Sequence, residues 1–257
     1  MRPIIARVGG KTKLAERLIA KFPDHKTYVE PFVGGGSIFF KKDPSEIEVI
    51  NDKDIDVMNI YRDVRNVESL SDREFQPNRA KFDRLKNQTK FKNEKERLYR
   101  NLYLSLVSFR GGRSSYIGEN HDPIRYQNVG NKFKDQKQYD QFRDRLNNNN
   151  VSIFSKDYQD IIKKFDAPDT FFYLDPPYSR AEKSKDYKEV GVKIEDICQF
   201  LKGIKGKFMM SYDAELNVKK ICPDFNIYKI KTKHESTAKD KGSYEVDEYL
   251  ITNFKMK

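Results

Sequence analysis

Four consecutive residues, Asp175-Pro176-Pro177-Tyr178, carry groups that could hold a flat ring bearing an amino group. They follow an apolar run, 171–174, that is typical of a buried strand. The Asp175 carboxylate and the Pro176 carbonyl can both accept hydrogen bonds from an exocyclic NH2, and proline offers no N–H to compete. Tyr178 provides a ring face for stacking. The alternative is an ordinary loop after a strand, with Asp175 as a cap.

A glycine-rich turn at Gly34 and Gly36 follows another apolar run, 27–33. Glycine lets the backbone approach a ligand closely and adopt a positive φ. Asp52 ends the next predicted strand, where an acid can accept hydrogen bonds from both hydroxyls of a ribose. Phe39 occupies the third glycine position of a dinucleotide fingerprint, which disfavours NAD. The turn and the spaced acid favour another ribose-bearing cofactor, whereas the turn alone could be a simple connection.

The two sites together suggest methyl transfer to the amino group of a base. The N6 amine of adenine is conjugated with its ring and is a poor nucleophile. Acceptors at Asp175 and Pro176 would favour the pyramidal, partly positive nitrogen of the transition state over the flat ground state. A base inside a duplex cannot reach this geometry, so it must be flipped out and stacked, here on Tyr178.

These motifs resemble those of the Dam-like family (D12 class) of DNA adenine-N6 methyltransferases. The motif order is the alpha type, in which the target-recognition segment lies between the cofactor motif and the 175–178 tetrad. Residues 8–11 resemble the N-terminal Gly-Gly-Lys motif of the family, and 29–37 resemble its cofactor motif. Asp52 matches the ribose-binding acid, and 155–158 resemble the acidic motif at the cofactor adenine. The resemblance covers nearly the whole chain.

The resemblance implies S-adenosyl-L-methionine as the cofactor and double-stranded DNA as the substrate. It implies four catalytic residues, namely Asp175, Pro176, Pro177 and Tyr178. The implied cofactor-binding residues are Arg7, Lys11, Phe32, Gly34, Gly36, Asp52, Asp157 and Asp175. The implied fold is an α/β, Rossmann-like methyltransferase sheet. Residues 112–114 replace a stretch that carries base-reading side chains in the family, so the target sequence stays open.

The elements that must position these residues alternate between strands and helices at both ends of the chain. Helices are expected over 11–22, from Ile38 onward and through Met58 to Tyr61. Strands are expected at 27–33, 48–52, 151–154, 171–174, 207–211, 227–231 and 248–252. This pattern predicts a parallel sheet with right-handed crossovers.

The pattern breaks in the middle of the chain, where one strong helical stretch at 98–106 lies among polar and basic residues. We expect a catalytic domain from 1–62 and 148–257, and a mainly helical target-recognition insertion at 63–147. The asparagine run 147–150 is predicted to be a turn or linker and not part of a helix or strand.

Basic and aromatic residues within this insertion are candidate DNA contacts. They are Phe109, Arg110, Arg113, Arg125, Lys132 and Lys134. Arginine can bridge O6 and N7 of guanine, lysine can neutralise phosphate, and an aromatic side chain can fill the gap left by a flipped base. Phe109 as a core residue and the lysines as a solvated face are the alternatives. Residues 179–190 are predicted to form a loop that orders over the flipped base.

Lysine and arginine outnumber aspartate and glutamate by 50 to 39, giving a net charge of +11. Such an excess favours a polyanionic partner, although a lysine-rich composition alone would also explain it. Cys198 and Cys222 form no C-x-x-C pair, which disfavours a disulfide scaffold or a thiolate zinc site and favours a reducing compartment. We expect no metal, no membrane helix and no signal peptide, hence a cytoplasmic protein that is not secreted. A monomer or weak dimer is expected.

The leading hypothesis is a site-specific enzyme that methylates adenine N6 in duplex DNA with S-adenosyl-L-methionine. The same chemistry on RNA adenine or on the N4 amine of cytosine is the enzymatic alternative. Asp175 favours adenine, because cytosine-N4 enzymes of similar type more often carry serine there. A catalytically inactive DNA-binding relative is the other alternative, and the presence of Lys11, Asp52, Asp175 and Tyr178 argues against it.

Overall fold

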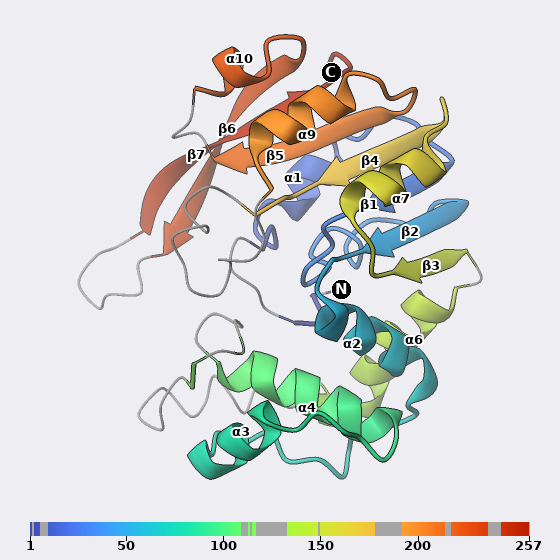
Figure 1. The fold of residues 1–257 in the computed structure, drawn as a ribbon, viewed down its shortest axis with the longest axis vertical. Coiled ribbons are helices and arrows are strands. Elements are labelled where there is room, and N and C mark those ends of the chain that lie inside the picture. Colours follow the sequence, from blue (N-terminus) through green and yellow to red (C-terminus); the bar gives the residue numbers. More distant parts are fainter. Residues whose placement is uncertain are drawn as a thin grey trace.

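The computed structural model describes residues 1, 3–5, 10–108, 113, 115–116, 133–148, 150–177, 192–213, 217–235 and 243–256. Within these residues, seven strands form one sheet in the order β3-β2-β1-β4-β5-β7-β6 (Figure 1). The strands are β1 (Thr27–Glu30), β2 (Ile47–Asn51), β3 (Val151–Phe154), β4 (Thr170–Leu174), β5 (Lys207–Asp213), β6 (Asn226–Glu235) and β7 (Ser243–Thr252). Strands β1 to β5 pair in parallel, whereas β7 runs antiparallel to both β5 and β6.

The path of the chain through the sheet changes direction between β1 and β4. From β1 the chain moves outward through β2 to β3, and it then returns to β4 and moves to β5 on the other side. In open α/β sheets, ligands bind outside the carboxyl ends of the strands at such a switch point. The order confirms the expected Rossmann-like sheet of the α/β class, with β7 as an additional antiparallel strand.

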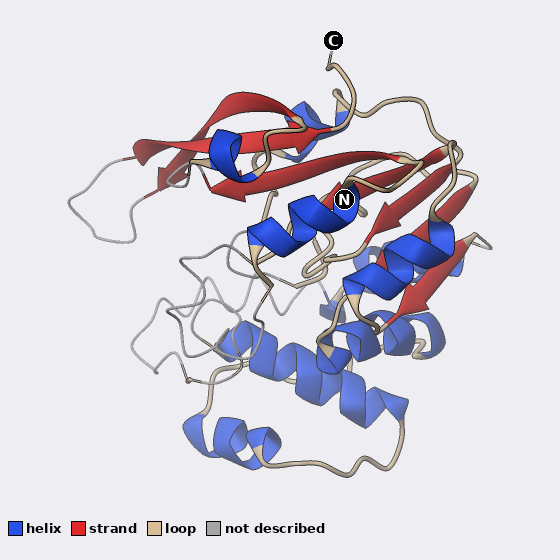
Figure 2. Ribbon diagram, turned by 45° about the horizontal axis from the view of Figure 1, so that its top comes forward, coloured by secondary structure: helices blue, strands red, loops and turns tan. Residues whose placement is uncertain are grey.

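Helices cover both faces of the sheet, which explains why its central strands are so apolar. Every residue of β1 and β4 is buried, as is typical of parallel strands that are covered on both sides. Val29 and Phe172 pack on one face with α7 (Tyr158–Phe165) and α9 (Ile194–Leu201), which lie across the sheet in Figures 1 and 2. Tyr28 and Phe171 point to the opposite face and pack with α1 (Ala15–Ile19).

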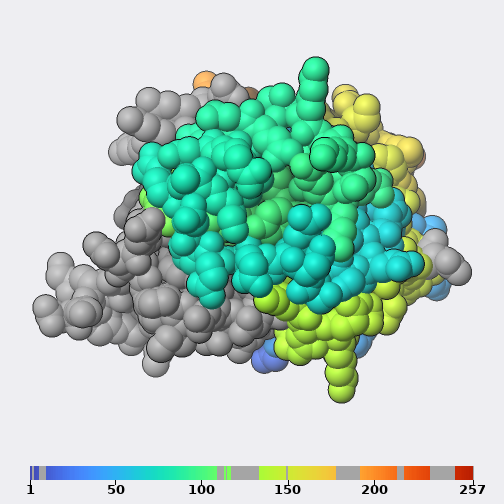
Figure 3. Space-filling model, turned by 90° about the horizontal axis from the view of Figure 1, so that it is seen from below, coloured from blue at the N-terminus to red at the C-terminus, as the bar shows by residue number. Residues whose placement is uncertain are grey.

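A second group of helices lies to one side of the sheet, below it in Figure 1 and toward the viewer in Figure 3. The group consists of α2 (Ile55–Asn66), α3 (Arg79–Lys86), α4 (Glu94–Val107) and α6 (Gln136–Asn147). Its core includes Ile60 of α2, Leu102 of α4 and Phe142 of α6. The described part of the expected insertion is therefore helical, and α2 runs across the boundary predicted at residue 63.

Polar contacts with buried acids join α4 to α2 within this helical group and join α6 to the sheet. Arg97 of α4 donates from Nε to Oδ2 of Asp63 in α2 at 2.9 Å, and the Asp63 side chain is buried. Arg145 of α6 donates from Nη2 to Oε1 of the buried Glu48 in β2 at 2.8 Å. The Arg145 guanidinium carbon also lies 3.9 Å from the centre of the Phe39 ring. In both pairs the carboxylate is buried, so each arginine compensates a charge that water does not reach.

Some expectations about helices are wrong. The segment 38–40 forms turns instead of beginning a helix, and its three successive side chains are all buried. A helix would direct three successive side chains to different sides, so packing on all of them favours the turns. Helix α1 is shorter than the predicted 11–22, and α6 includes Asn147, which was predicted to lie in a turn.

Cys198 of α9 and Cys222, which follows α10 (Val218–Ile221), form a disulfide with their Cα atoms 5.7 Å apart. This bond differs from the reduced state that the cysteine pattern suggested. The two residues are 24 positions apart, and no spacing motif connects them. They meet because α9 and the chain near α10 pack into the same hydrophobic core.

In the described parts of the chain, no helix has the length and apolar character needed to cross a membrane. The same residues contain no group of three or more histidine, cysteine, aspartate or glutamate side chains placed to hold a metal ion.

Candidate active site

The predicted site residues follow four neighbouring parallel strands, each at its carboxyl end. Gly34 follows β1, Asp52 follows β2, Asp157 follows β3 and Asp175 follows β4. Because these strands are parallel, their carboxyl ends lie along one edge of the sheet. The fold therefore brings residues that are up to 141 positions apart to a common edge at the switch point.

The glycine turn after β1 needs glycine for two different reasons. Gly34 and Gly36 have φ angles of +49° and +76°, which side chains rarely adopt. A Cβ atom at Gly36 would lie 2.8 Å from the Tyr61 hydroxyl, so the turn packs tightly on that side. A Cβ atom at Gly34 would have no heavy atom of the described residues within 4 Å. The backbone at Gly34 is thus open to the approach of a ligand. Tyr61 of α2 fixes the turn, because its hydroxyl donates a hydrogen bond to the Gly34 carbonyl at 2.8 Å.

Asp52 lies directly beside the glycine turn. Its Oδ2 accepts a hydrogen bond from the Gly34 amide at 3.0 Å, and its Oδ1 accepts one from the Asp54 amide at 2.9 Å. The carboxylate therefore fixes the loop after β2 against the turn after β1. The spacing of the two motifs predicted that Asp52 would accept hydrogen bonds from the hydroxyls of a ribose, and that role stays a prediction.

Asn51 ties together the backbone of two loops at this edge, a role that the sequence did not indicate. Its side chain is buried and donates to the carbonyls of Pro31 at 2.9 Å and of Lys156 at 3.1 Å. Its Oδ1 accepts from the Lys156 amide at 2.9 Å. The loops after β1 and β3 are thus held by one amide. The available signal was a polar residue at the end of a buried strand.

Asp175 lies in a polar corner together with Lys11. Lys11 is only 4% exposed, and its Nζ donates to Oδ1 of Asp175 at 2.7 Å. Ser211 of β5 donates to the same oxygen at 3.3 Å, and the Tyr173 hydroxyl lies 2.9 Å from Ser211 Oγ. Glu248 of β7 lies 3.9 Å from Lys11 Nζ. Lys11 therefore compensates the charge of Asp175, and Ser211 helps to orient it.

Glu30, the last residue of β1, is a buried acid next to this corner. It accepts a hydrogen bond from the Tyr28 hydroxyl at 2.8 Å. Burial, with a contribution from the charge of Asp175, raises the pKa of Glu30 to about 8. Burial and the charge of Asp175 likewise raise the pKa of Tyr173 well above its ordinary value. The raised pKa of Glu30 thus favours its protonated form near neutral pH.

A cavity of about 550 Å³ lies next to the acid after β3. It is lined by Lys53, by Asp157 to Gln159, by Val192, and by Asp196, Gln199 and Phe200 of α9. The Tyr158 ring in its wall packs against Phe32 with ring centres 5.2 Å apart. This volume is within the range of pockets for small molecules and cofactors. The sequence analysis did not predict that α9 lines this cavity, because the residues of α9 match no cofactor-binding motif.

Asp157 has two structural partners in addition to its place in the cavity. Its Oδ1 accepts from the Gln159 amide at 3.0 Å and caps α7. Lys53 Nζ lies 3.7 Å from its Oδ2. Its carboxylate is thus held at the cavity wall by the start of a helix.

Other predicted residues divide into two groups. Arg7, Tyr178, Phe109, Arg110, Arg125, Lys132 and the loop 179–190 lie outside the described residues. Of the candidate DNA contacts that are described, Lys134 pairs with Glu74 at 2.9 Å, and Arg113 pairs with Asp54 and Asp56 at the start of α2. The structure thus brings together Lys11, the glycine turn, Asp52 and Asp175, with Phe32 and Asp157 at the adjoining cavity.

Comparison with known proteins places this geometry in a family. The profile of the D12 class N6 adenine-specific DNA methyltransferases matches residues 8–236. The type II methyltransferase M1.LlaDCHI of Lactococcus lactis subsp. cremoris is 28% identical, over 99% of this chain and 96% of its own length. M.MjaIII of Methanocaldococcus jannaschii is 27% identical, over 99% of each chain. M.CviBI of Paramecium bursaria Chlorella virus NC1A is 27% identical, over 83% of this chain and 84% of its own.

The family match spans the chain from before Lys11 to beyond Asp175, so it includes the glycine turn, Asp52 and Asp157 as well. The chain belongs to the D12 class of N6 adenine-specific DNA methyltransferases.

Proposed function

We propose that the chain uses S-adenosyl-L-methionine as its methyl donor, that the edge of the sheet after β1 to β4 binds it, and that Asp175 and Pro176 hold the adenine amine. One observation carries the proposal. The glycine turn and the acids Asp52, Asp157 and Asp175 converge at the switch point of the sheet, where Asp52 already contacts the turn. A common edge of this kind is what a transfer between two bound molecules requires.

The residues at this edge fit the cofactor by their chemistry. The open backbone at Gly34 allows close approach, and the Asp52 carboxylate beside it suits the hydroxyls of a ribose. The cavity offers the aromatic side chains Tyr158 and Phe200 for a flat ring, with Asp157 as an acceptor for its amino group. When bound, the cofactor supplies a methyl group on a positively charged sulfur.

Asp175 and Pro176 would hold the adenine. The bond that forms joins the methyl carbon to N6 and the bond that breaks joins it to sulfur, and N6 then loses one proton. As positive charge develops on N6, the Asp175 carboxylate stabilises it. Lys11 and Ser211 fix the Asp175 oxygen Oδ1 at 2.7 and 3.3 Å. This preorganisation places the acceptor before the base arrives.

The helical insertion would bind the DNA around the target base. Its candidate contacts are the basic residues predicted there, of which Lys134 is described and about one-third exposed. Base flipping would then bring the adenine to Asp175.

The test is transfer of a labelled methyl group from S-adenosyl-L-methionine to unmethylated duplex DNA, single-stranded DNA and RNA in parallel, followed by nucleoside analysis. We expect label as N6-methyladenine in duplex DNA. Label in RNA or as N4-methylcytosine would keep the site and change the substrate. Cofactor binding without transfer, at the level of an Asp175→Ala control, would indicate an inactive relative.

A further inference from the structure

The chain between Ser108 and Tyr116 begins and ends on the helical insertion. Ser108 directly follows α4, and its hydroxyl donates to the Leu104 carbonyl. Ser108 and Tyr116 form an antiparallel bridge, so the chain returns to where it left the helix. The Tyr116 ring packs against Phe82 of α3 with ring centres 5.4 Å apart. Both ends of this segment are therefore attached to the expected DNA-binding region.

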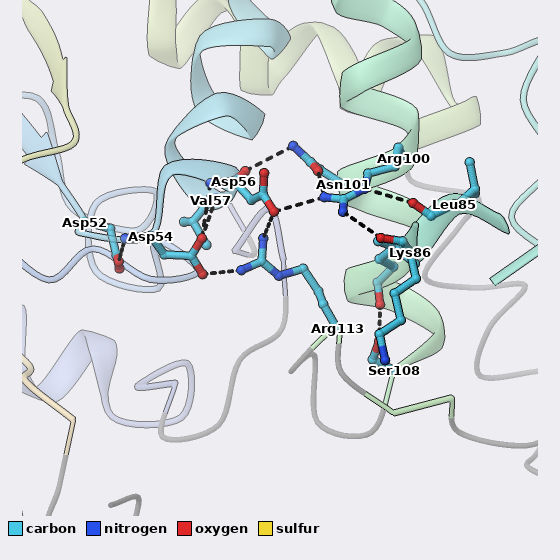
Figure 4. A network of polar contacts seen from close by, with 11 residues as sticks. Asp52, Asp54, Asp56, Val57, Leu85, Lys86, Arg100, Asn101, Ser108 and Arg113 are labelled. Carbon is cyan, nitrogen blue, oxygen red and sulfur yellow. Dashed lines mark hydrogen bonds and ion pairs between the residues drawn. The ribbon is translucent and has the colours of Figure 1, made fainter. Parts of the chain in front are cut away.

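Arg113, within this segment, contacts the start of α2, directly after the loop that follows β2. Its guanidinium forms ion pairs with Asp54 and with Asp56, the latter at 3.2 Å from Nη1 (Figure 4). The Arg113 side chain is 17% exposed, so water screens these pairs only in part. Its φ of +59° is in the left-handed region, which disfavours a residue with a side chain. The backbone thus adopts an uncommon conformation at Arg113, the residue whose side chain contacts Asp54 and Asp56.

From Asp54 the contacts continue to the glycine turn. Asp54 caps α2 by accepting hydrogen bonds from the amides of Asp56 and Val57. The Asp54 amide donates to Asp52 Oδ1 at 2.9 Å, and Asp52 Oδ2 accepts from the Gly34 amide at 3.0 Å. A continuous series of polar contacts therefore leads from the insertion to the proposed cofactor site.

Asp56 strengthens this connection, because a second arginine of the insertion also binds it. Arg100 of α4 donates to Asp56 Oδ2 at 2.9 Å. Its neighbour Asn101 donates to the Asp56 carbonyl at 3.3 Å (Figure 4). The start of α2 is thus held from α4 by Arg100 and from the segment after α4 by Arg113.

We propose that Arg113 is a positioning residue that couples DNA binding by the helical insertion to cofactor binding at Asp52. DNA that engages the insertion holds Arg113 against Asp54, and Asp54 in turn fixes Asp52 at the glycine turn. DNA and cofactor then each tighten the binding of the other by the same factor. The inference rests on the proposed function, and it replaces a direct DNA contact by Arg113 with a contact inside the protein.

The test measures S-adenosylhomocysteine binding by calorimetry, with and without fragments of unmethylated genomic DNA. This product lacks the methyl group, so no turnover intervenes. For the wild type we expect DNA to tighten binding by about five- to 30-fold. In Arg113→Ala, DNA should no longer tighten S-adenosylhomocysteine binding. In Arg113→Lys, which retains the charge, DNA should tighten it by part of the wild-type factor. Arg84→Ala removes an exposed arginine of α3 while both arginine partners of Asp56 remain, so it should keep the full factor.

Asp54→Asn supplies the reciprocal variant. Asparagine can still cap α2, but it removes the charge that Arg113 meets. The coupling factor should fall as in Arg113→Ala, and the double variant should lose little more than either single one. If Arg113→Ala does not fold, the comparison of Asp54→Asn with the wild type decides the question.

Three results would overturn the inference. One is a wild type in which DNA leaves cofactor affinity unchanged, and another is an Asp54→Asn variant that keeps the full factor. The third is an Arg113→Ala variant that keeps the factor but loses DNA affinity with a shallower salt dependence, as expected for a phosphate contact. Failure of the proposed function looks different, because the wild type would then bind no S-adenosylhomocysteine or transfer no methyl group.

Discussion

The chemistry proposed for Asp175 depends on a buried cation. Lys11 lies 2.7 Å from it and is almost completely excluded from water. Removing one partner of such a pair leaves a charge without compensation, which costs more than the pair itself contributes. Asp175 would then lose the contact that fixes its Oδ1 in the position proposed for meeting the adenine amine.

Lys11→Met should therefore lower kcat by about 100-fold, the usual effect of losing one preorganised electrostatic contact. Methionine has a similar volume, so packing is largely retained. Lys41→Met is the matched control, because Lys41 pairs with Glu16 at 2.8 Å on the surface. The measurement is single-turnover methyl transfer with saturating cofactor and DNA. A Lys11→Met rate equal to that of the control would contradict the role of Lys11.

Glu30 makes stability depend on pH. Its pKa is raised from 4.5 to about 8, mainly by burial, so the folded protein binds more protons than the unfolded chain between these values. The contribution of Glu30 to stability is therefore complete below about pH 4.5 and is lost as the pH rises toward 8. Its slope can reach about 1.4 kcal/mol per pH unit.

Glu30→Gln should remove this slope while keeping an acceptor for the Tyr28 hydroxyl. Urea denaturation of both proteins from pH 5 to 8 gives the difference directly, because all other titrating groups are common. The variant should gain on the wild type as the pH rises. A difference in unfolding free energy that stays constant over this range would mean that Glu30 is ionised throughout.

At the scale of the element, the glycine turn after β1 lies at the proposed cofactor-binding edge of the sheet and is hydrogen-bonded to α2. Gly36→Ala would strain a φ of +76° and force a Cβ atom to within 2.8 Å of the Tyr61 hydroxyl. We expect a loss of about 1–3 kcal/mol in unfolding free energy and weaker cofactor binding. Gly203→Ala is the control, because its added Cβ would meet no described heavy atom within 4 Å. Equal melting temperatures for the two variants would exclude the strain.

The strands could be predicted from the sequence better than the helices. β4 was predicted to within one residue, because a parallel strand covered on both faces consists of a continuous apolar run. β3 was predicted with its observed bounds, although this edge strand is only partly buried. Helices α3 and α6 were not predicted, because only a few buried residues such as Phe82 and Phe142 mark their inner faces. The helix predicted from residue 38 onward was wrong, because the apolar residues 38–40 are buried in turns and not on one face of a helix.

The candidate site was predicted in its acids and glycines but not in the groups that hold them. Asp52 and Asp175 stand in short motifs whose chemistry can be read locally. The roles of Asn51, Ser211 and α9 depend on which loops and strands become neighbours, and no local pattern contains that information. Arg113 illustrates the same limit, since its acidic partners are more than 50 residues away.

At the scale of the whole molecule, the net charge of +11 should control DNA binding. If four phosphates are neutralised, raising the salt from 50 to 200 mM should weaken binding by roughly 100-fold. Lys134→Ala should reduce the slope by less than one phosphate contact, because Lys134 is paired with Glu74. Fluorescence anisotropy with labelled duplex fragments measures both slopes. A nearly flat salt dependence would argue against a phosphate clamp.

The buried contacts between the helical insertion and the sheet limit how target specificity can change in this lineage. Arg145 of α6 meets Glu48 inside the sheet domain, and Arg97 of α4 meets the buried Asp63 of α2. A recognition unit transplanted from a relative would bring its own side chains to these positions and leave Glu48 or Asp63 without its cation. New specificities should therefore arise by exchange of surface residues within the resident helices, while whole-unit grafts will need matched changes at both acids.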